Sequence, residues 1–191
     1  MAILIPHASL RVAPWKNGGG STTEIAVSPK GAGFDDFDWR ISLATITASG
    51  PFSSFPGIDR SLMLVDGESV SLTLDGARKV VLNAGQPMLW FPGEAAVSAE
   101  VAGATTDFNV MTRRSRCRHQ LEKITAPGRL ARRSDKTLLF VAGEGYVLVR
   151  AGQQQFNLSR YDALLLDAGD AQQWQLEAAQ DVAIFRVDLF I

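Results

Sequence analysis

Four residues in the first third of the chain are of the types that bind anions. Lys16 and Asn17 precede three glycines, Arg40 lies in an alternating run, and Arg60 follows a loop rich in proline and glycine. A guanidinium is a planar donor that matches a carboxylate through two parallel hydrogen bonds. The first chemistry that the sequence suggests is therefore the binding of a small carboxylate.

The glycine run Gly18–Gly20 follows Lys16 and Asn17 directly. One interpretation is that its backbone N–H groups are open to an anion, and the other is a flexible turn into the strand that follows. It is not a P-loop, because the G-x-x-x-x-G-K-[ST] spacing is absent and no helix follows. A dinucleotide fingerprint is excluded for the same reasons.

The segment Trp39–Ala44 alternates between large apolar residues and small or charged ones. In a strand, Arg40 and Ser42 share one face, because successive side chains point to opposite faces. Glu24 has a similar position on a neighbouring predicted strand. Such a face either lines a polar pocket inside a barrel or meets solvent.

The segment Ser49–Arg60 is a loop by composition, yet it contains Phe52 and Phe55. Phenylalanines in a loop usually pack over something, here a barrel mouth or a ligand. Arg60 ends the loop, where a guanidinium is well placed to bind a carboxylate. The alternative is an ion pair with a nearby acid such as Asp59.

The inventory of metal ligands and nucleophiles is small. The two histidines, His7 and His119, are far apart in the sequence, so we expect no bound metal and no cofactor. Cys117 lies among arginines and could pair with His119 on one strand face, but a plain, partly buried cysteine is the simpler interpretation. Neither G-x-S-x-G nor H-E-x-x-H is present.

The second half of the chain resembles the first at an offset of 76 residues. Arg60–Thr112 slides without a gap onto Lys136–Asp188, which makes Lys136 the counterpart of Arg60. Turn glycines that keep register over such a span indicate the same strand plan twice. Ten aligned pairs are identical: Leu62/Leu138, Gly67/Gly143, Glu68/Glu144, Leu72/Leu148, Gly76/Gly152, Leu82/Leu158, Leu89/Leu165, Gly93/Gly169, Ala95/Ala171 and Ala102/Ala178.

Short apolar or alternating runs separated by turn residues predict an all-β fold with little helix. Asp75-Gly76 and Ala151-Gly152 are placed at corresponding hairpin tips. One helical turn is expected near Gly128–Ser134. The runs in the first repeat are Ser61–Val65, Val70–Leu74, Lys79–Leu82, Met88–Phe91, Val97–Val101 and Phe108–Met111.

Bulk composition bounds the remaining classes. The chain has 191 residues, 46% of them hydrophobic, with a net charge of −1 and one cysteine. Near-neutral charge gives no case for nucleic acid, and a single cysteine fits a reducing compartment. The start MAILIPHASL lacks a basic region, and no apolar run is long enough to span a membrane. A cytoplasmic protein without membrane or nucleic-acid partners is expected.

Basic residues gather in Arg113–Lys136, which joins the two repeats. This segment holds nine basic residues and two acidic ones, Glu122 and Asp135. It is either a site for an anionic partner such as RNA or a solvated connector whose arginines pair with acids elsewhere. The second interpretation is favoured, because aromatic residues for base stacking are missing.

Four stretches together resemble the HutD/Ves family. They are PWKNGGGSTTEIA at 14–26, WRISLATI at 39–46, SGPFSSFPGIDRSLMLVDG at 49–67 and DFNVMTRR at 107–114. The resemblance implies a bicupin-like fold, two β-barrel or jelly-roll repeats packed in one chain without the cupin histidines. We divide it into an N-terminal barrel, 1–114, with the ligand pocket and a smaller C-terminal barrel, 115–191.

The resemblance also implies a role in moderating histidine utilisation, with urocanate or N-formylglutamate as the ligand. A metal-independent enzyme, an isomerase or hydrolase with Glu24 as acid or base, remains the alternative. The predicted pocket offers one carboxylate and no histidine base, which favours binding over catalysis. Edge strands of such barrels often pair, so a homodimer is one expected assembly. The residues that we assign to the ligand pocket are Lys16, Asn17, Glu24, Arg40, Ser42, Phe52, Phe55, Arg60 and Asn109.

Overall fold

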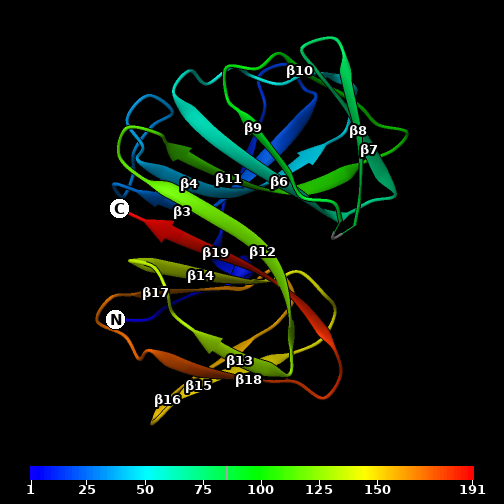
Figure 1. Ribbon diagram of the computed structural model, residues 1–191. Helices are drawn as coiled ribbons and strands as arrows, with labels where there is room; N and C mark the ends of the chain where they lie inside the picture. Colours follow the sequence, from blue (N-terminus) through cyan, green and yellow to red (C-terminus); the bar gives the residue numbers. More distant parts are fainter. Residues whose placement is uncertain (85) are drawn as a thin grey trace. The chain divides into compact units, whose positions relative to one another are not determined.

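The computed structural model of the protein describes residues 1–84 and 86–191, and strands dominate both ranges (Figure 1). Within them, the helical content is one 3-10 turn, η1 (His7–Ser9). None of the helices in the described ranges is long and apolar enough to cross a membrane. The strands form antiparallel sheets, which confirms the all-β prediction, and the chain divides into two compact units.

The unit Leu10–Arg118 contains a six-stranded and a four-stranded sheet. The strand order is β2-β3-β4-β11-β6-β9 in the larger sheet and β5-β10-β7-β8 in the smaller one. The bounds are β2 (Val12–Pro14), β3 (Gly20–Ser28), β4 (Trp39–Ile46), β5 (Gly50–Pro51), β6 (Ile58–Asp66), β7 (Ser69–Leu74), β8 (Arg78–Asn83), β9 (Leu89–Pro92), β10 (Val97–Glu100) and β11 (Thr105–Arg113).

The core of this unit lies between its two sheets. Leu62 and Leu64 on β6 share one apolar cluster with Leu72 on β7 and Val97 on β10. Burial of one such side chain contributes about 1.5–3 kcal/mol. Since side chains alternate along a strand, the positions in register with Leu62 and Leu64 identify which face of the larger sheet points inward.

The β7–β8 hairpin turns at Asp75 and Gly76, as the sequence predicts. Both residues have positive φ, 48° and 70°. A tight turn between two antiparallel strands needs this left-handed backbone at both central positions, which aspartate and glycine tolerate best.

The other unit combines Met1–Ser9 with His119–Ile191. Its sheets have the orders β1-β17-β14-β19-β12 and β13-β18-β15-β16. The bounds are β1 (Ile3–Ile5), β12 (Arg118–Ala126), β13 (Gly128–Ala131), β14 (Lys136–Val141), β15 (Val147–Ala151), β16 (Gln154–Leu158), β17 (Ala163–Asp167), β18 (Gln173–Glu177) and β19 (Val182–Phe190).

The division differs from the one that we placed between residues 114 and 115. The first nine residues lie with the second unit because β1 pairs with β17, where Ile3 is opposite Leu165. The N-terminal amine also lies 2.7 Å from an Asp167 carboxylate oxygen. A three-residue strand carries too little pattern to predict such a distant partner.

The two units repeat one strand plan, but not in the gap-free register of the sequence alignment. Leu62 belongs to the core cluster of its unit, whereas its aligned partner Leu138 does not belong to the corresponding cluster and Leu139 does. The true counterpart lies one residue further along in β14. The structural counterpart of Arg60 is therefore Thr137, and Lys136 was the wrong assignment.

The helical turn expected near Gly128–Ser134 was also wrong. Gly128–Ala131 forms β13, in which Leu130 lies opposite Trp174 of β18. Leu130 is 1% exposed, so its burial against the second core outweighs a local preference for a turn.

Candidate functional site

Polar side chains cover the inward face of β4, β6 and β11 in the unit Leu10–Arg118. Asn109 on β11 lies opposite Ser42 and Leu62, and Leu62 belongs to the core cluster, so all three point inward. One step along, Met111 lies between Arg40 and Arg60. The sheet thus brings Arg40, Ser42, Arg60 and Asn109 onto one face.

Arg60 is a buried cation without a counter-ion in contact. It is 6% exposed, and its Nε–H has no hydrogen-bond partner. Among residues 1–84 and 86–191, no carboxylate lies within 4.0 Å of its guanidinium. The interpretation of Arg60 as half of an ion pair with Asp59 does not hold, because Asp59 pairs with Arg114 at 2.8 Å.

Three aromatic rings surround the Arg60 guanidinium. Its Cζ lies 5.0 Å from the ring centre of Phe91, 5.3 Å from that of Phe52 and 5.6 Å from that of Phe55. Cation–π attraction of this kind contributes about 2 kcal/mol when the cation is desolvated. Burial still lowers the pKa of Arg60 to about 10, against the opposing charge of Asp107.

Asp107 and Asn109 add two buried oxygens to the same interior. Asp107 is 2% and Asn109 is 6% exposed, and the Oδ1 atom of each lacks a hydrogen-bond partner. Burial raises the pKa of Asp107 to about 7, and the charge of Arg60 limits the rise. A buried carboxyl that titrates near neutral pH is typical of functional sites.

The sequence analysis missed Asp107, although a signal was present. Asp107, Asn109 and Met111 alternate with the apolar residues Phe108 and Val110 along β11. A polar residue at the inward positions of a buried strand would have marked Asp107 as a candidate.

Glu24 and Arg40 form an ion pair at the rim of this face. Arg40 Nη2 lies 2.9 Å from Glu24 Oε2, and their side chains are 12% and 38% exposed. Arg40 Cζ also lies 4.2 Å from the ring centre of Phe34. Because Glu24 satisfies Arg40, Arg60 remains the stronger anchor for an added anion.

The loop that carries Phe52 and Phe55 is held by its backbone. Phe52 N–H donates to Val97 O at 2.8 Å, and Phe55 N–H donates to Gly93 O at 2.7 Å. Gly93 is required there, since a Cβ at this position would lie 2.4 Å from Phe55 O. The two rings therefore cover Arg60 from defined positions.

Lys16 and Asn17 are not brought to this face. They lie exposed in the β2–β3 turn, where Asn17 Oδ1 accepts a 3.0 Å hydrogen bond from Gly19 N–H. The turn leads into Gly20, which pairs with Ile46 at one end of β4, whereas Arg40 lies near the other end. At about 3.3 Å per residue, the two positions on β4 are roughly 20 Å apart. The glycine run is a turn into β3.

In the corresponding interior of the other unit, the buried carboxylate and the arginines beside it are in direct contact. Asp188, fully buried, lies opposite Thr137 and accepts hydrogen bonds from Thr137 at 2.8 Å and Arg133 at 2.7 Å. Arg186 Nε lies 2.9 Å from Asp188 Oδ2. Arg186, a buried arginine of the second unit, therefore has a carboxylate in contact, whereas Arg60 has none among the described residues.

Three arginines of the basic connector Arg113–Lys136 form ion pairs with acids of their own unit. Arg114 binds Asp59 and Glu94, and Arg116 lies 2.6 Å from Asp38. Arg133 pairs with Glu122 at 3.0 Å. This supports the interpretation of a connector whose arginines find acids within the fold.

Cys117 is not an activated thiol. Burial raises the pKa of Cys117 to about 11, and its Sγ donates to the Asp38 carbonyl oxygen at 3.0 Å. Nucleophilic thiols have a lowered pKa, so the Cys117–His119 interpretation loses its basis.

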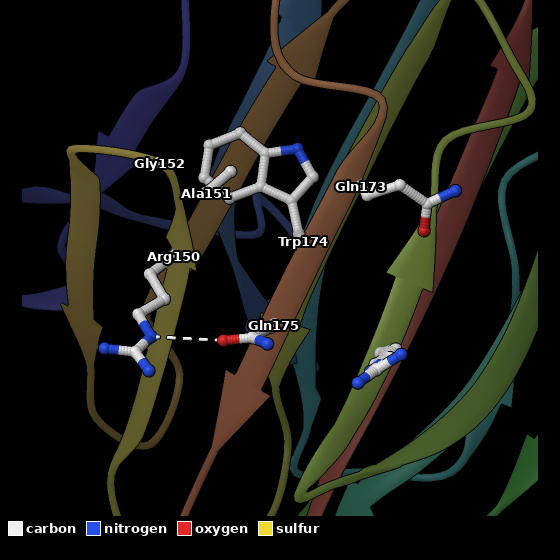
Figure 2. A pocket seen from close by; sticks show the side chains of 7 residues that line it. Arg150, Ala151, Gly152, Gln173, Trp174 and Gln175 are labelled. Atoms are coloured by element: carbon white, nitrogen blue, oxygen red, sulfur yellow. Dashed lines mark hydrogen bonds between the residues drawn. The ribbon is translucent and has the colours of Figure 1, made fainter.

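A cavity of about 600 Å³ lies in the second unit, on the outer face of β13, β15 and β18. Figure 2 shows Arg150 and Gln175 pointing toward one another, with Nε and Oε1 3.3 Å apart. Arg150 is also paired with Glu177 at 2.7 Å. This cavity holds exposed polar side chains, not a buried unpaired one, and it is the weaker candidate. It is lined by Arg129, Arg150, Ala151, Gly152, Gln173, Trp174 and Gln175.

Among the described residues, no group of three or more His, Cys, Asp or Glu side chains is arranged to hold a metal ion. The polar atoms at the Arg60 site are instead one guanidinium, one carboxyl and one amide. Arg60 can bind an anion, and the Oδ1 atoms of Asp107 and Asn109 can accept hydrogen bonds from an N–H or O–H group of a ligand.

The HutD family model matches residues 7–184 of the chain. A 21.2 kDa protein in the hutC 3′ region of Pseudomonas putida is 36% identical over 163 residues, which cover 82% of each chain. Protein Ves of Cronobacter sakazakii is 35% identical over 179 residues, 91% of this chain and 87% of Ves.

Solved structures agree with this family. HutD from Pseudomonas fluorescens SBW25, described for a formate condition, superposes with a TM-score of 0.85 at 28% identity, covering 100% of this chain and 98% of HutD. A salicylate 1,2-dioxygenase from Pseudoaminobacter salicylatoxidans, at 10% identity, has a TM-score of 0.66 over 98% of this chain and 80% of its own. The latter likeness shows the cupin-like fold alone.

Proposed function

Since the chain belongs to the HutD family, which is linked to histidine utilisation, we propose that it is a non-catalytic small-carboxylate-binding protein that moderates this pathway. The ligand is urocanate or N-formylglutamate, bound inside the unit Leu10–Arg118. The observation that carries the proposal is the unpaired, buried guanidinium of Arg60.

A buried charge without a partner is unfavourable unless something compensates it. Within the described residues, the Arg60 guanidinium has aromatic faces around it but no oxygen bonded to its Nε. A ligand carboxylate supplies that oxygen, and hydrogen bonds to charged groups contribute about 1.5–3 kcal/mol each. Arg186 Nε in the other unit also lacks a hydrogen bond, but the Asp188 carboxylate 2.9 Å away neutralises its charge, whereas no carboxylate of the described residues contacts Arg60.

The remaining groups fit the rest of these ligands. Phe52 and Phe55 offer aromatic faces against which the flat imidazole of urocanate could stack. The free Oδ1 atoms of Asp107 and Asn109 could accept from the imidazole or formamide N–H.

Thermal unfolding tests the proposal. The midpoint is measured for metal-stripped protein with urocanate, N-formylglutamate, histidine, formate and an unrelated small carboxylate. A ligand at 100 times its Kd stabilises by about 2.7 kcal/mol, a rise of several degrees for a protein of this size. We expect the rise with one pathway acid in the wild type and not in Arg60→Met.

Arg78→Met is the matched control, because Arg78 begins β8 beside the β7–β8 turn and its side chain is exposed. It should keep the full shift. An unchanged midpoint with every carboxylate, or an equal shift in Arg60→Met, would refute the proposal.

One observation favours a metal-independent enzyme as the second candidate. Asp107, with a pKa of about 7, could donate and accept a proton at neutral pH. Incubation of the protein with each pathway acid, followed by proton NMR, distinguishes the two candidates. Product formation that is lost in Asp107→Asn would establish catalysis, and unchanged spectra with saturable binding would support the binding role.

A further inference from the structure

We infer that Asp107 is the internal counter-charge of Arg60, and that an anionic ligand takes its place while the Asp107 carboxylate takes up one proton. This inference rests on the proposed function, because it assumes that the ligand is an anion bound at Arg60. It adds a binding determinant that the ligand does not need to contact.

Arg60 and Asp107 lie in the interior of the same unit without being in direct contact. Arg60 is on β6 and Asp107 on the neighbouring β11, both on the inward face, and they are 6% and 2% exposed. No contact within 4.0 Å joins them, and Arg60 Nε and Asp107 Oδ1 are both without a hydrogen-bond partner. They stabilise each other through space across a low-dielectric core, where charges interact strongly.

The other charged groups on the facing strands do not replace Arg60. Asp107 lies opposite Ala44 on β4 and Leu64 on β6. The charges that β3 and β4 add to this face, Glu24 and Arg40, form their own ion pair at the rim. The inward positions of β7, β9 and β10 are apolar: Val70, Leu72, Leu74, Leu89, Phe91, Val97 and Ala99.

The proton balance follows from this isolation. In the free site, the Arg60 cation holds the pKa of the buried Asp107 to about 7, so the carboxylate is partly ionised at neutral pH. A bound carboxylate neutralises Arg60 and adds a second negative charge, which raises the pKa of Asp107. Asp107 then takes a proton from solvent, and the site with ligand carries one cation, one anion and one neutral acid.

The second unit shows the arrangement in which no such exchange is expected. Burial acts to raise the pKa of Asp188, but hydrogen bonds from Thr137 and Arg186 outweigh it and hold the pKa below the ordinary value. Its oxygens contact Arg133 and Arg186 directly. A carboxylate held in this way stays ionised and is not displaced.

Calorimetric titration with N-formylglutamate and formate between pH 6 and pH 9 tests the inference, since both probes stay ionised there. We expect the association constant to fall towards tenfold per pH unit above about pH 7, and the heat to depend on the buffer's ionisation enthalpy. Asp107→Asn should bind with a flat pH profile and no buffer dependence. Asp75→Asn, at the exposed β7–β8 turn, should keep the wild-type slope.

A measurement without ligand separates this inference from the proposed function. The carboxyl carbon of Asp107, identified by its absence in Asp107→Asn, should titrate near pH 7 in the wild type and higher in Arg60→Met. Titration near pH 4 would overturn the inference even if the probes bind. Binding with a flat pH profile in the wild type would overturn it too, whereas no binding of any probe would refute the proposed function.

Discussion

Replacing Arg60 and Arg186, two of the buried arginines, by methionine should have different effects on stability. Arg60 and Arg186 are buried to nearly the same extent, 6% and 7% exposed, and each lies inside its unit. Methionine keeps much of the volume of the arginine stem and removes the charge. The two variants therefore isolate the contribution of the charge in each environment.

For Arg60→Met, the expected change in the free energy of unfolding is close to zero. A pKa lowered from 12.5 to about 10 corresponds to a cost of about 3 kcal/mol for the buried charge, at about 1.4 kcal/mol per pKa unit. Removing the charge would gain this amount, but the variant also loses the cation–π contacts, which reduces this gain by about 2 kcal/mol. Asp107, which loses its counter-charge, becomes fully protonated, and this costs a further ~1 kcal/mol at pH 7.5. The three contributions nearly cancel, so Tm should change little.

For Arg186→Met, the expected change is a loss of about 3 kcal/mol. Arg186 Nε lies 2.9 Å from Asp188 Oδ2, and Arg186 Nη2 donates to Ala131 O at 2.8 Å. Removal leaves the fully buried Asp188 carboxylate without one of its cations, and breaking a buried pair typically costs 3–5 kcal/mol.

Urea unfolding at pH 7.5, followed by circular dichroism, measures both changes. A gain or no change for Arg60→Met and a clear loss for Arg186→Met would support the assignment of Arg60 as an unpaired, functional cation. A loss of more than about 2 kcal/mol for Arg60→Met would refute the reasoning, because it would make Arg60 a structural residue.

Three further outcomes follow from the structure. Asp188→Asn should lower the free energy of unfolding by about 3 kcal/mol at pH 7. Urea titration should show the difference shrinking once the pH falls below the ordinary aspartate pKa of about 4 and towards the lowered pKa of Asp188. An equal difference at pH 3 would contradict this. Gly93→Ala should destabilise by about 1–3 kcal/mol in thermal unfolding, because the added Cβ would lie 2.4 Å from Phe55 O; an unchanged Tm would show that the loop yields freely. Cys117 should react with iodoacetamide at pH 7.5 about 100-fold more slowly than an exposed thiol, because burial raises its pKa to about 11, and reaction at the rate of free cysteine would disprove that environment.

The sequence predicted which side chains share the inward face where the alternation was clear. Arg40 and Ser42 share the inward face because their strand alternates, and Arg60 was assigned from its place at the end of a loop. Lys16 and Asn17 were grouped with them because they are close in sequence, but their turn lies at the far end of β4 from Arg40. Strand register is a long-range property that composition does not reveal.

The repeat was visible in the sequence, but its register was not. The β7–β8 and β15–β16 hairpins both turn at an aligned glycine with positive φ, Gly76 and Gly152. The inward residues Val147 and Val149 of β15, however, already lie one position beyond those aligned with β7. In β14 the inward residue is Leu139, one position beyond the aligned one. A one-residue slip exchanges the two faces of a strand, so only the packed core reveals it.

Asp107 shows a different limit of sequence reasoning. Its type and its place on a strand could be read from the sequence. Its pKa, however, is raised by burial, and the rise is limited by the charge of Arg60, 47 residues earlier on the same inward face. Chemistry that depends on burial and on a distant charge becomes evident only after the strands are paired.

The most direct test of the central claim is the arginine Nε–Hε NMR spectrum of the wild-type protein during titration with urocanate, N-formylglutamate and formate. The Arg60 signal is assigned by its absence in Arg60→Met, and signals from Arg78 and Arg150 serve as internal controls. The account predicts that the Arg60 signal alone moves downfield and saturates, as its free Nε–H gains a carboxylate acceptor. A stationary Arg60 signal with all three acids at about 10 mM, in folded protein, would contradict it.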